Sequence, residues 1–130
     1  MKRKQIREEA KLYFIPFLLG DNSTSHILSL KIFKKYHIKS LILDKTRRLS
    51  DIFDLSSKFT QIADTKHHAI TVMHLKDLAV QTQYTLPLLI PCTSEYEELV
   101  SEYRAELESE FIILSADFSF ENSPLSVIPN

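Results

Sequence analysis

Carboxylate, amide and hydroxyl side chains directly follow several apolar runs of this 130-residue chain. Such groups can bind a hydroxyl, an amine or a metal ion, and they can accept or donate a proton. If the runs are parallel strands, their carboxyl ends meet at one edge of a sheet, where α/β proteins bind ligands. The candidate site residues at this edge are Gly20, Asp21, Asn22, Ser23, Asp44, Lys45, Thr93, Glu95 and Tyr96.

The stretch FLLGDNSTSHILSL (17–30) contains the only glycine of the chain, Gly20. A strand that ends in glycine and leads into a helix is typical of dinucleotide-binding loops, but that fingerprint needs three glycines. Asp21 would also repel a phosphate beside it. Asp44 falls near the position of a ribose-binding acid, which supports the topology more than the ligand. A phosphate-binding P-loop is excluded because it needs two glycines.

The sequence also lacks residues that a metal site, a catalytic cysteine or a phosphoacceptor domain would need. His67, His68 and His74 do not have helical metal-ligand spacing, and we expect them to be surface histidines. Cys92 has no histidine assignable as its base, so a small buried residue is the better interpretation. A phosphoacceptor domain would need an acidic pair where Asp21 stands alone. For Glu95 and Tyr96 two roles stay open, a helix start with a core aromatic or contacts that line a cleft.

Five apolar segments alternate with helical patterns along the chain. Helical spacing of apolar residues predicts helices over 23–37, 70–82 and 93–109, with a short helical turn at 50–55. Pro16 is awkward in a central strand, so the first strand is expected to be mainly Phe17–Leu19 or to bulge at Pro16. The order predicts an α/β fold, a three-layer Rossmann-like parallel sheet of about five strands with helices on both faces. The expected strands cover residues 12–20, 38–44, 58–64, 86–92 and 110–116.

Charge and composition exclude several classes of partner. The chain has 16 Lys and Arg against 17 Asp and Glu, so no global positive field favours nucleic acid or an anionic membrane. Its apolar runs are too short to span a bilayer, and its single cysteine allows no intrachain disulfide. We therefore expect a cytoplasmic protein. The expected organisation is a charged N-terminal extension (1–11), one domain (12–116) and a linker (117–130).

Three quoted stretches carry a family resemblance. FIPFLLGDNSTSHILSLKIFKKYHIKSLILD, KFTQI and LPLLIPCTSEYEELVSEYRAELESEFIIL resemble the N-terminal, pre-ATP-grasp domain of ATP-grasp carboxylate–amine ligases. The nearest group is that of D-aspartate ligase and carbamoyl phosphate synthase. The second half resembles it more strongly, with a strand ending at Cys92-Thr93, then Glu95-Tyr96, and a helix containing Arg104. The resemblance covers about residues 12–116.

The resemblance implies a function that this chain would not perform alone. Enzymes of the family activate a carboxylate as an acyl phosphate, which an amine then attacks. ATP and Mg²⁺ are expected in two further lobes, on the same chain or on a partner chain, and the N-terminal domain shapes the substrate side of the cleft. The implied substrate-side contacts are the nine candidate residues above, with Glu95 as the best polar contact. No catalytic or metal-binding residue is expected within the 130 residues, and self-association is plausible.

Two features depart from the family pattern. Relatives often have a paired glycine or several small residues after the first strand, where this chain has Gly20-Asp21. They also often have an arginine in the first helix, where this chain has Lys31, Lys34 and Lys35. The alternative from another class is a stand-alone α/β module that binds a small ligand or a protein. A dinucleotide-dependent enzyme is the third hypothesis.

Overall fold

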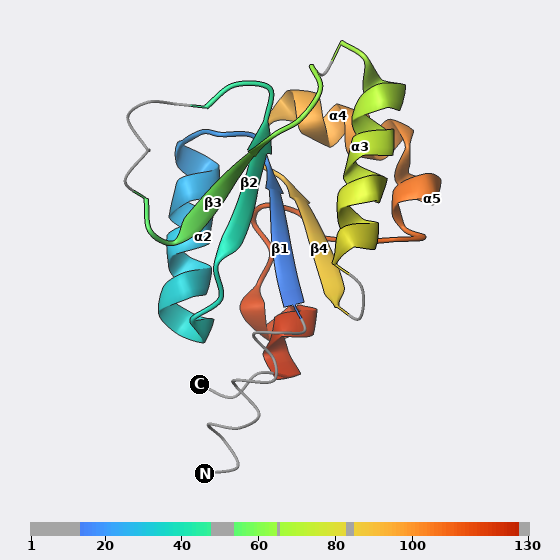
Figure 1. The fold of residues 1–130 in the computed structure, drawn as a ribbon. Coiled ribbons are helices and arrows are strands. Elements are labelled where there is room, and N and C mark those ends of the chain that lie inside the picture. The colour runs from blue at the N-terminus through green and yellow to red at the C-terminus, as the bar shows by residue number, and fades with distance from the viewer. Residues whose placement is uncertain (1–13, 48–53, 65, 83–84, 128–130) are drawn as a thin grey trace.

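Strands and helices alternate along residues 14–47, 54–64, 66–82 and 85–127, which are the residues that the computed structural model describes (Figure 1). The predicted N-terminal extension (1–11) and most of the predicted turn at 50–55 lie outside them. The elements are β1 (Phe14–Leu19), α2 (Ser23–Tyr36), β2 (Ser40–Asp44), β3 (Ser57–Gln61), α3 (His68–Gln81), β4 (Leu86–Pro91), α4 (Ser94–Glu102), α5 (Arg104–Leu107), β5 (Ile112–Ile113) and the 3-10 turns η2 (Phe120–Asn122) and η3 (Pro124–Val127).

The five strands form one parallel sheet in the order β3-β2-β1-β4-β5. This confirms the predicted α/β, Rossmann-like fold with a parallel sheet of five strands. The chain first moves outward from β1 to β3 and then returns to place β4 against the other side of β1. The order therefore reverses between β1 and β4, and this is the position where doubly wound sheets open a crevice beyond their carboxyl ends.

Each face of the sheet is covered by its own apolar cluster. On one face, Leu28, Ile32 and Tyr36 of α2 pack against alternate strand residues such as Leu18. On the other face, residues of α3, α4 and α5 pack against the intervening strand residues, with an edge-to-face contact between Phe17 and Phe111 at 5.2 Å. The central strands β1 and β4 are therefore buried on both faces, as their continuous apolar runs predict.

Pro16 lies inside the central strand β1, although proline donates no hydrogen bond. Gly20 donates its N–H to the carbonyl of Leu43 on the β2 side, at 2.8 Å. Because N–H groups alternate in direction along a strand, the missing N–H of Pro16 would face β2 as well. The pairing of β2 with β1 begins only at Phe17 opposite Leu41. Pro16 thus costs no hydrogen bond of the sheet, and β1 extends further towards its N-terminus than Phe17–Leu19.

The predicted C-terminal helix and last strand are both shorter than the sequence pattern suggests. The helix expected over 93–109 is interrupted at Tyr103, which has φ −110° and ψ 26°. After this interruption the single turn of α5 buries Leu107 completely. The strand expected over 110–116 pairs with β4 only at Ile112 and Ile113.

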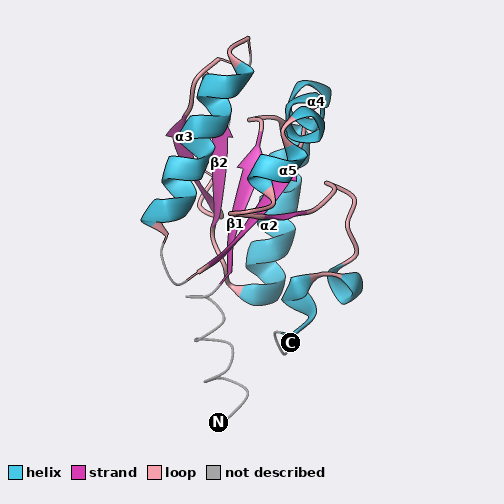
Figure 2. Ribbon diagram, turned by 90° about the vertical axis from the view of Figure 1, so that its right-hand side faces the viewer, coloured by secondary structure: helices cyan, strands magenta, loops and turns pink. Residues whose placement is uncertain are grey.

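Residues 117–127 belong to the compact domain, at a position where the sequence analysis expects a linker. Leu125 is completely buried in the cluster on the α2 face, and Phe118 and Phe120 pack against that cluster. The ring of Phe120 meets Tyr36 edge to face at 5.5 Å, and the Lys35 ammonium lies 5.0 Å from its centroid. In Figure 2 the strands lie between α3 and these C-terminal turns.

A chain that ends at Ala116 is expected to lose about 3–5 kcal/mol of its free energy of unfolding. The truncation removes buried Leu125 and two partly buried phenylalanines from an otherwise complete core. Urea unfolding measures the loss, and a chain that ends at Val127 is the control, with unchanged stability. Equal stability of the two truncated chains would show that the C-terminal turns are dispensable.

Candidate functional site

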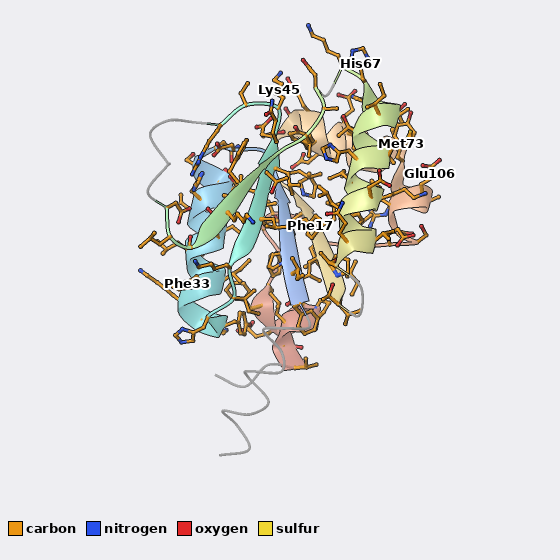
Figure 3. The ribbon with its side chains drawn as sticks, in the orientation of Figure 1. Phe17, Phe33, Lys45, His67, Met73 and Glu106 are labelled. Carbon is orange, nitrogen blue, oxygen red and sulfur yellow. The ribbon has the colours of Figure 1, made fainter. Side chains whose placement is uncertain are left out.

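The loops after β1 and β4 define the candidate site, at the upper end of the sheet in Figure 1. The loop after β1 leads to α2 on one face, and the loop after β4 leads to α4 on the other. We call residues 20–23, 44–45 and 92–96 the carboxyl edge. All nine candidate residues lie on it, and Figure 3 shows Lys45 at this end of the molecule.

The carboxylate of Asp44 joins three elements at the carboxyl edge. Its Oδ2 accepts the backbone N–H of Asp21 at 2.8 Å. Its Oδ1 accepts the N–H of Lys45 at 2.7 Å and the hydroxyl of Tyr96 at 3.1 Å. A carboxylate has about four acceptor positions, so three protein donors occupy most of them. Asp44 is therefore committed to holding β1, β2 and α4 together and is poorly available to a ribose hydroxyl.

Tyr96 contributes a buried aromatic ring and a hydrogen-bond donor to this arrangement. Its side chain is almost completely buried in the cluster formed with α3, α4 and α5. Burial, and next the negative charge of Asp44, raise the pKa of the Tyr96 phenol far above its ordinary value. The hydroxyl consequently stays protonated and keeps donating to Asp44. Of the two roles that the sequence left open for Tyr96, this geometry favours that of a core aromatic.

Gly20 allows the β4 loop to approach β1 closely. Its φ of 111° is a conformation that L side chains rarely adopt. A Cβ added to Gly20 would lie 2.6 Å from Cγ2 of Thr93. The glycine is therefore required by its own backbone and by a threonine of the same protein, rather than by the approach of a phosphate.

Asn22 joins the loops after β1 and β4 with a hydrogen bond. Its Nδ2 donates to the carbonyl of Cys92 at 3.0 Å, and the Cys92 N–H donates to Leu19 at 2.8 Å. Asn22 is also the N-cap of α2, since its Oδ1 accepts the N–H of Ser25 while Ser25 Oγ accepts the N–H of Asn22. The loops after β1 and β4 are thus fixed to each other, and the start of α2 is capped.

Cys92 is buried, as the sequence analysis expected, and its thiol is unreactive. Burial, with a further contribution from the charge of Glu97, raises the pKa of Cys92 to about 12. A thiol with such a pKa carries almost no thiolate at neutral pH, so it is a poor nucleophile and metal ligand.

The groups that face solvent along the carboxyl edge are hydroxyls, one carboxylate and the half-exposed ammonium of Lys45. Ser23, Ser94 and Glu95 are exposed, whereas Thr93 caps α4 by accepting the N–H of Tyr96 at 3.2 Å. The Lys45 ammonium lies 3.9 Å from the Asp64 carboxylate, both about half exposed, which is a weak interaction in water. The carboxyl edge therefore presents polar groups to solvent around Gly20, Asp44 and Tyr96, which contact other groups of the same protein.

His26 and Asp54 extend this polar cluster, and the sequence analysis did not select them. His26 Nε2 lies 2.6 Å from Oδ1 of Asp21, and its Nδ1 contacts Oδ2 of Asp54. His26 lies in the first helical turns after Asp21, which is a local signal that could have been noticed. Asp54 lies in the segment before β3, and only the folded chain brings it to α2.

Two hollows lie beside the helices that cover the face of the sheet opposite α2. One, of about 420 Å³, is lined by Lys66, His67, His68, Ala69, Ile70, Glu102 and Tyr103. His67 lies there at the top of α3 (Figure 3), and His68 Nδ1 is 2.7 Å from a carboxylate oxygen of Glu102. The other, of about 370 Å³, is lined by Pro91, Glu97, Val100, Ser101, Arg104, Ile113, Leu114 and Ser115.

Within the described residues, no three His, Cys, Asp or Glu side chains are arranged to hold a metal ion. The described helices include none with the length and apolar character needed to cross a membrane. Comparisons of the chain with protein-family models, with curated proteins and with solved structures find no match.

The variant Asp44→Asn is expected to lose about 1–3 kcal/mol of unfolding free energy. The amide keeps one acceptor oxygen but turns an N–H₂ group towards the N–H of Asp21, or towards Tyr96 and Lys45 if it flips. Asp64→Asn is the matched control at the end of a neighbouring strand, and it should change stability by less than about 0.5 kcal/mol. Equal values for the two variants in urea unfolding would contradict the role of Asp44.

The variant Gly20→Ala is expected to lose about 2–4 kcal/mol, because it combines a strained φ with a steric overlap. Adding Thr93→Ser removes Cγ2 but keeps the capping hydroxyl, and it should restore about 1 kcal/mol or more of the loss. The two variants are compared with Thr93→Ser alone by thermal and urea unfolding. A stable Gly20→Ala protein would refute the close approach.

Proposed function

We propose that this chain is the substrate-side N-terminal domain of an ATP-grasp carboxylate–amine ligase, of the D-aspartate ligase and carbamoyl phosphate synthase group. The complete enzyme would activate a carboxylate as an acyl phosphate and join it to an amine, in the cytoplasm. The proposal is supported by the sequence resemblance and by a fold whose carboxyl edge carries all nine candidate residues.

The observation that carries the proposal is the closed junction between the loops after β1 and β4. Thr93 packs against Gly20, and Asn22 bridges to Cys92, so the usual crevice is filled. Exposed Ser23 and Glu95 flank this junction. Such an edge is suited to form one wall of a site that another lobe completes, because it offers polar contacts without enclosing a ligand.

The proposal assigns ATP and Mg²⁺ to other lobes. Among the residues that the structure describes, no group of three His, Cys, Asp or Glu side chains is arranged to hold a metal ion, and Asp44 already accepts three hydrogen bonds. In the proposal the nucleotide binds to the other lobes, and this domain contributes binding and orientation of the carboxylate or the amine.

The outer face of α3 supports contact with a further lobe or with a second copy of the chain. Three apolar residues along one side of the helix are exposed, Ile70 by 55%, Met73 by 65% and Val80 by 52%. Met73 is labelled in Figure 3. Apolar side chains grouped in this way often mark a surface that a partner covers. The partner in the proposal is the ATP-grasp unit, on the same chain or on another.

The complete enzyme, with the ATP-grasp lobes on the same chain or on a partner chain, is expected to release phosphate from Mg–ATP only when a carboxylate substrate is present. Hydroxylamine, used as the amine, should trap the acyl phosphate as a hydroxamate. Glu95→Gln should raise the KM for one substrate about tenfold, which corresponds to one hydrogen bond to a charged group, and leave the KM for ATP within about twofold. Glu98→Gln, on the same helix and also exposed, is the control.

Calorimetry of the 130-residue chain with Mg–ATP should detect no binding. Tight binding of Mg–ATP to this chain, or a complete enzyme that forms no hydroxamate with any carboxylate, would contradict the proposal. The alternative function, a module that binds a small ligand, is favoured by the hollow of about 420 Å³ near His67, a volume typical of ligand pockets. That alternative predicts stabilisation by a ligand without ATP turnover.

A further inference from the structure

His26 lies between two carboxylates that come from different parts of the chain. Asp21 belongs to the loop after β1, His26 to α2, and Asp54 to the segment before β3. The Nε2 atom is 2.6 Å from Oδ1 of Asp21, and Nδ1 contacts Oδ2 of Asp54. The exposed fraction of the side chain is 16% for His26, 2% for Asp21 and 18% for Asp54, so water screens the interactions between their charges only partly.

Both ring nitrogens of His26 therefore face oxygen atoms that accept hydrogen bonds. A neutral imidazole has one N–H and one lone pair, so it can donate to only one carboxylate and turns its lone pair towards the other. An imidazolium donates to both, and each bond is then assisted by opposite charges. The two carboxylates therefore favour the protonated imidazolium form of His26, as long as both are ionised.

Asp54 is held in its ionised form by its surroundings. Burial alone would raise the pKa of Asp54, but hydrogen bonds from the Ser56 hydroxyl, His26, the Ser56 N–H and the Ser57 hydroxyl outweigh it and lower the pKa below its ordinary value. The Ser56 N–H and Ser57 Oγ lie 2.8 Å and 3.0 Å from the carboxylate. Asp54 consequently offers His26 a negative charge throughout the neutral pH range.

Other charged residues, connected to this cluster through hydrogen bonds or along the chain, lie at the end of β2 and along α2. At the end of β2, Asp44 accepts the N–H of Asp21. The neighbouring Lys45 is directed to Asp64 at 3.9 Å, and the next charged residue along α2 is Lys31. The N-terminal dipole of α2 disfavours a cation, but this effect is confined to the first turn and is smaller than two direct charge-assisted bonds.

We propose that His26 is a positioning residue which, as an imidazolium, fixes Asp21 at the carboxyl edge and makes the geometry of that edge depend on pH. Loss of the proton leaves one N–H for two carboxylates, so either the loop after β1 or the segment before β3 is released. The stabilisation is complete below the ordinary pKa of a histidine, about 6.5, and is lost as the pH rises through the raised titration midpoint of His26. It also weakens in acid, when Asp54, whose pKa lies below its ordinary value, becomes protonated. This inference does not require the ligase function.

The test is ¹⁵N NMR of the imidazole groups of the 130-residue chain between pH 5 and 10. We expect both nitrogens of His26 to carry protons at pH 7 and its titration midpoint to lie at least one unit above the ordinary value of about 6.5. The backbone amide signal of Asp21 should shift with the same midpoint. His74, which contacts no carboxylate among the described residues, is the control, and its signals should not follow the midpoint of the Asp21 amide.

The variant Asp54→Asn separates a specific role from a general loss of structure. Asn keeps the shape and the acceptor oxygen for Ser56 but removes the charge, so the midpoint of His26 should fall by about one unit. Asp77→Asn, at an exposed position on α3, should leave it unchanged. A His26 ring with an unprotonated nitrogen at pH 7, or a midpoint that Asp54→Asn does not alter, would overturn the proposal. Neither result depends on ATP or on the ligase reaction.

Discussion

The carboxylate of Asp44 is the interaction on which the carboxyl edge depends. A parallel sheet brings several strand ends together but leaves their loops without partners, because the ladder of hydrogen bonds stops there. Asp44 supplies acceptors to Asp21 in the loop after β1, to Lys45 directly after β2 and to Tyr96 in α4. Because Tyr96 is buried and its phenol remains protonated, its hydrogen bond to Asp44 persists over the whole neutral pH range.

This network changes the chemistry expected of a doubly wound sheet. In a dinucleotide-binding protein, the glycine after the first strand and the acid after the second are directed to the ligand. Here Gly20 makes room for Thr93, and Asp44 binds groups of its own chain. The same positions therefore contribute to stability and to the shape of the edge, and the residues left to meet a ligand lie around them. A closed edge of this kind is consistent with one wall of a shared site.

Most of the fold could be predicted from sequence because the central strands are continuous apolar runs and the helices α2 and α4 have side-chain caps. Asn22 and Thr93 act as caps where the sequence predicts helix starts. What could not be predicted depends on contacts between distant residues. Leu125 is buried only because η2 and η3 fold back onto α2, and periodicity carries no signal of that.

The same difference between local sequence signals and contacts of distant residues applies to the candidate site. Residues directly after strands can be placed by position, since topology brings all strand ends to one edge, and the family resemblance selects among them. The partners of those residues were not identified, because a hydrogen bond between His26 and Asp54 requires knowledge of how the segment before β3 approaches α2. Sequence therefore located the carboxyl edge, whereas only the structure showed that its central groups bind one another.

The most direct test of this account is the amide hydrogen exchange of Asp21. Its N–H points at Oδ2 of Asp44 and is part of no helix or strand. The account predicts protection of this amide close to that of the neighbouring core strands, and loss of the protection in Asp44→Asn. Exchange at the rate of an exposed loop in the unmodified protein would contradict it, because the carboxyl edge would then be open.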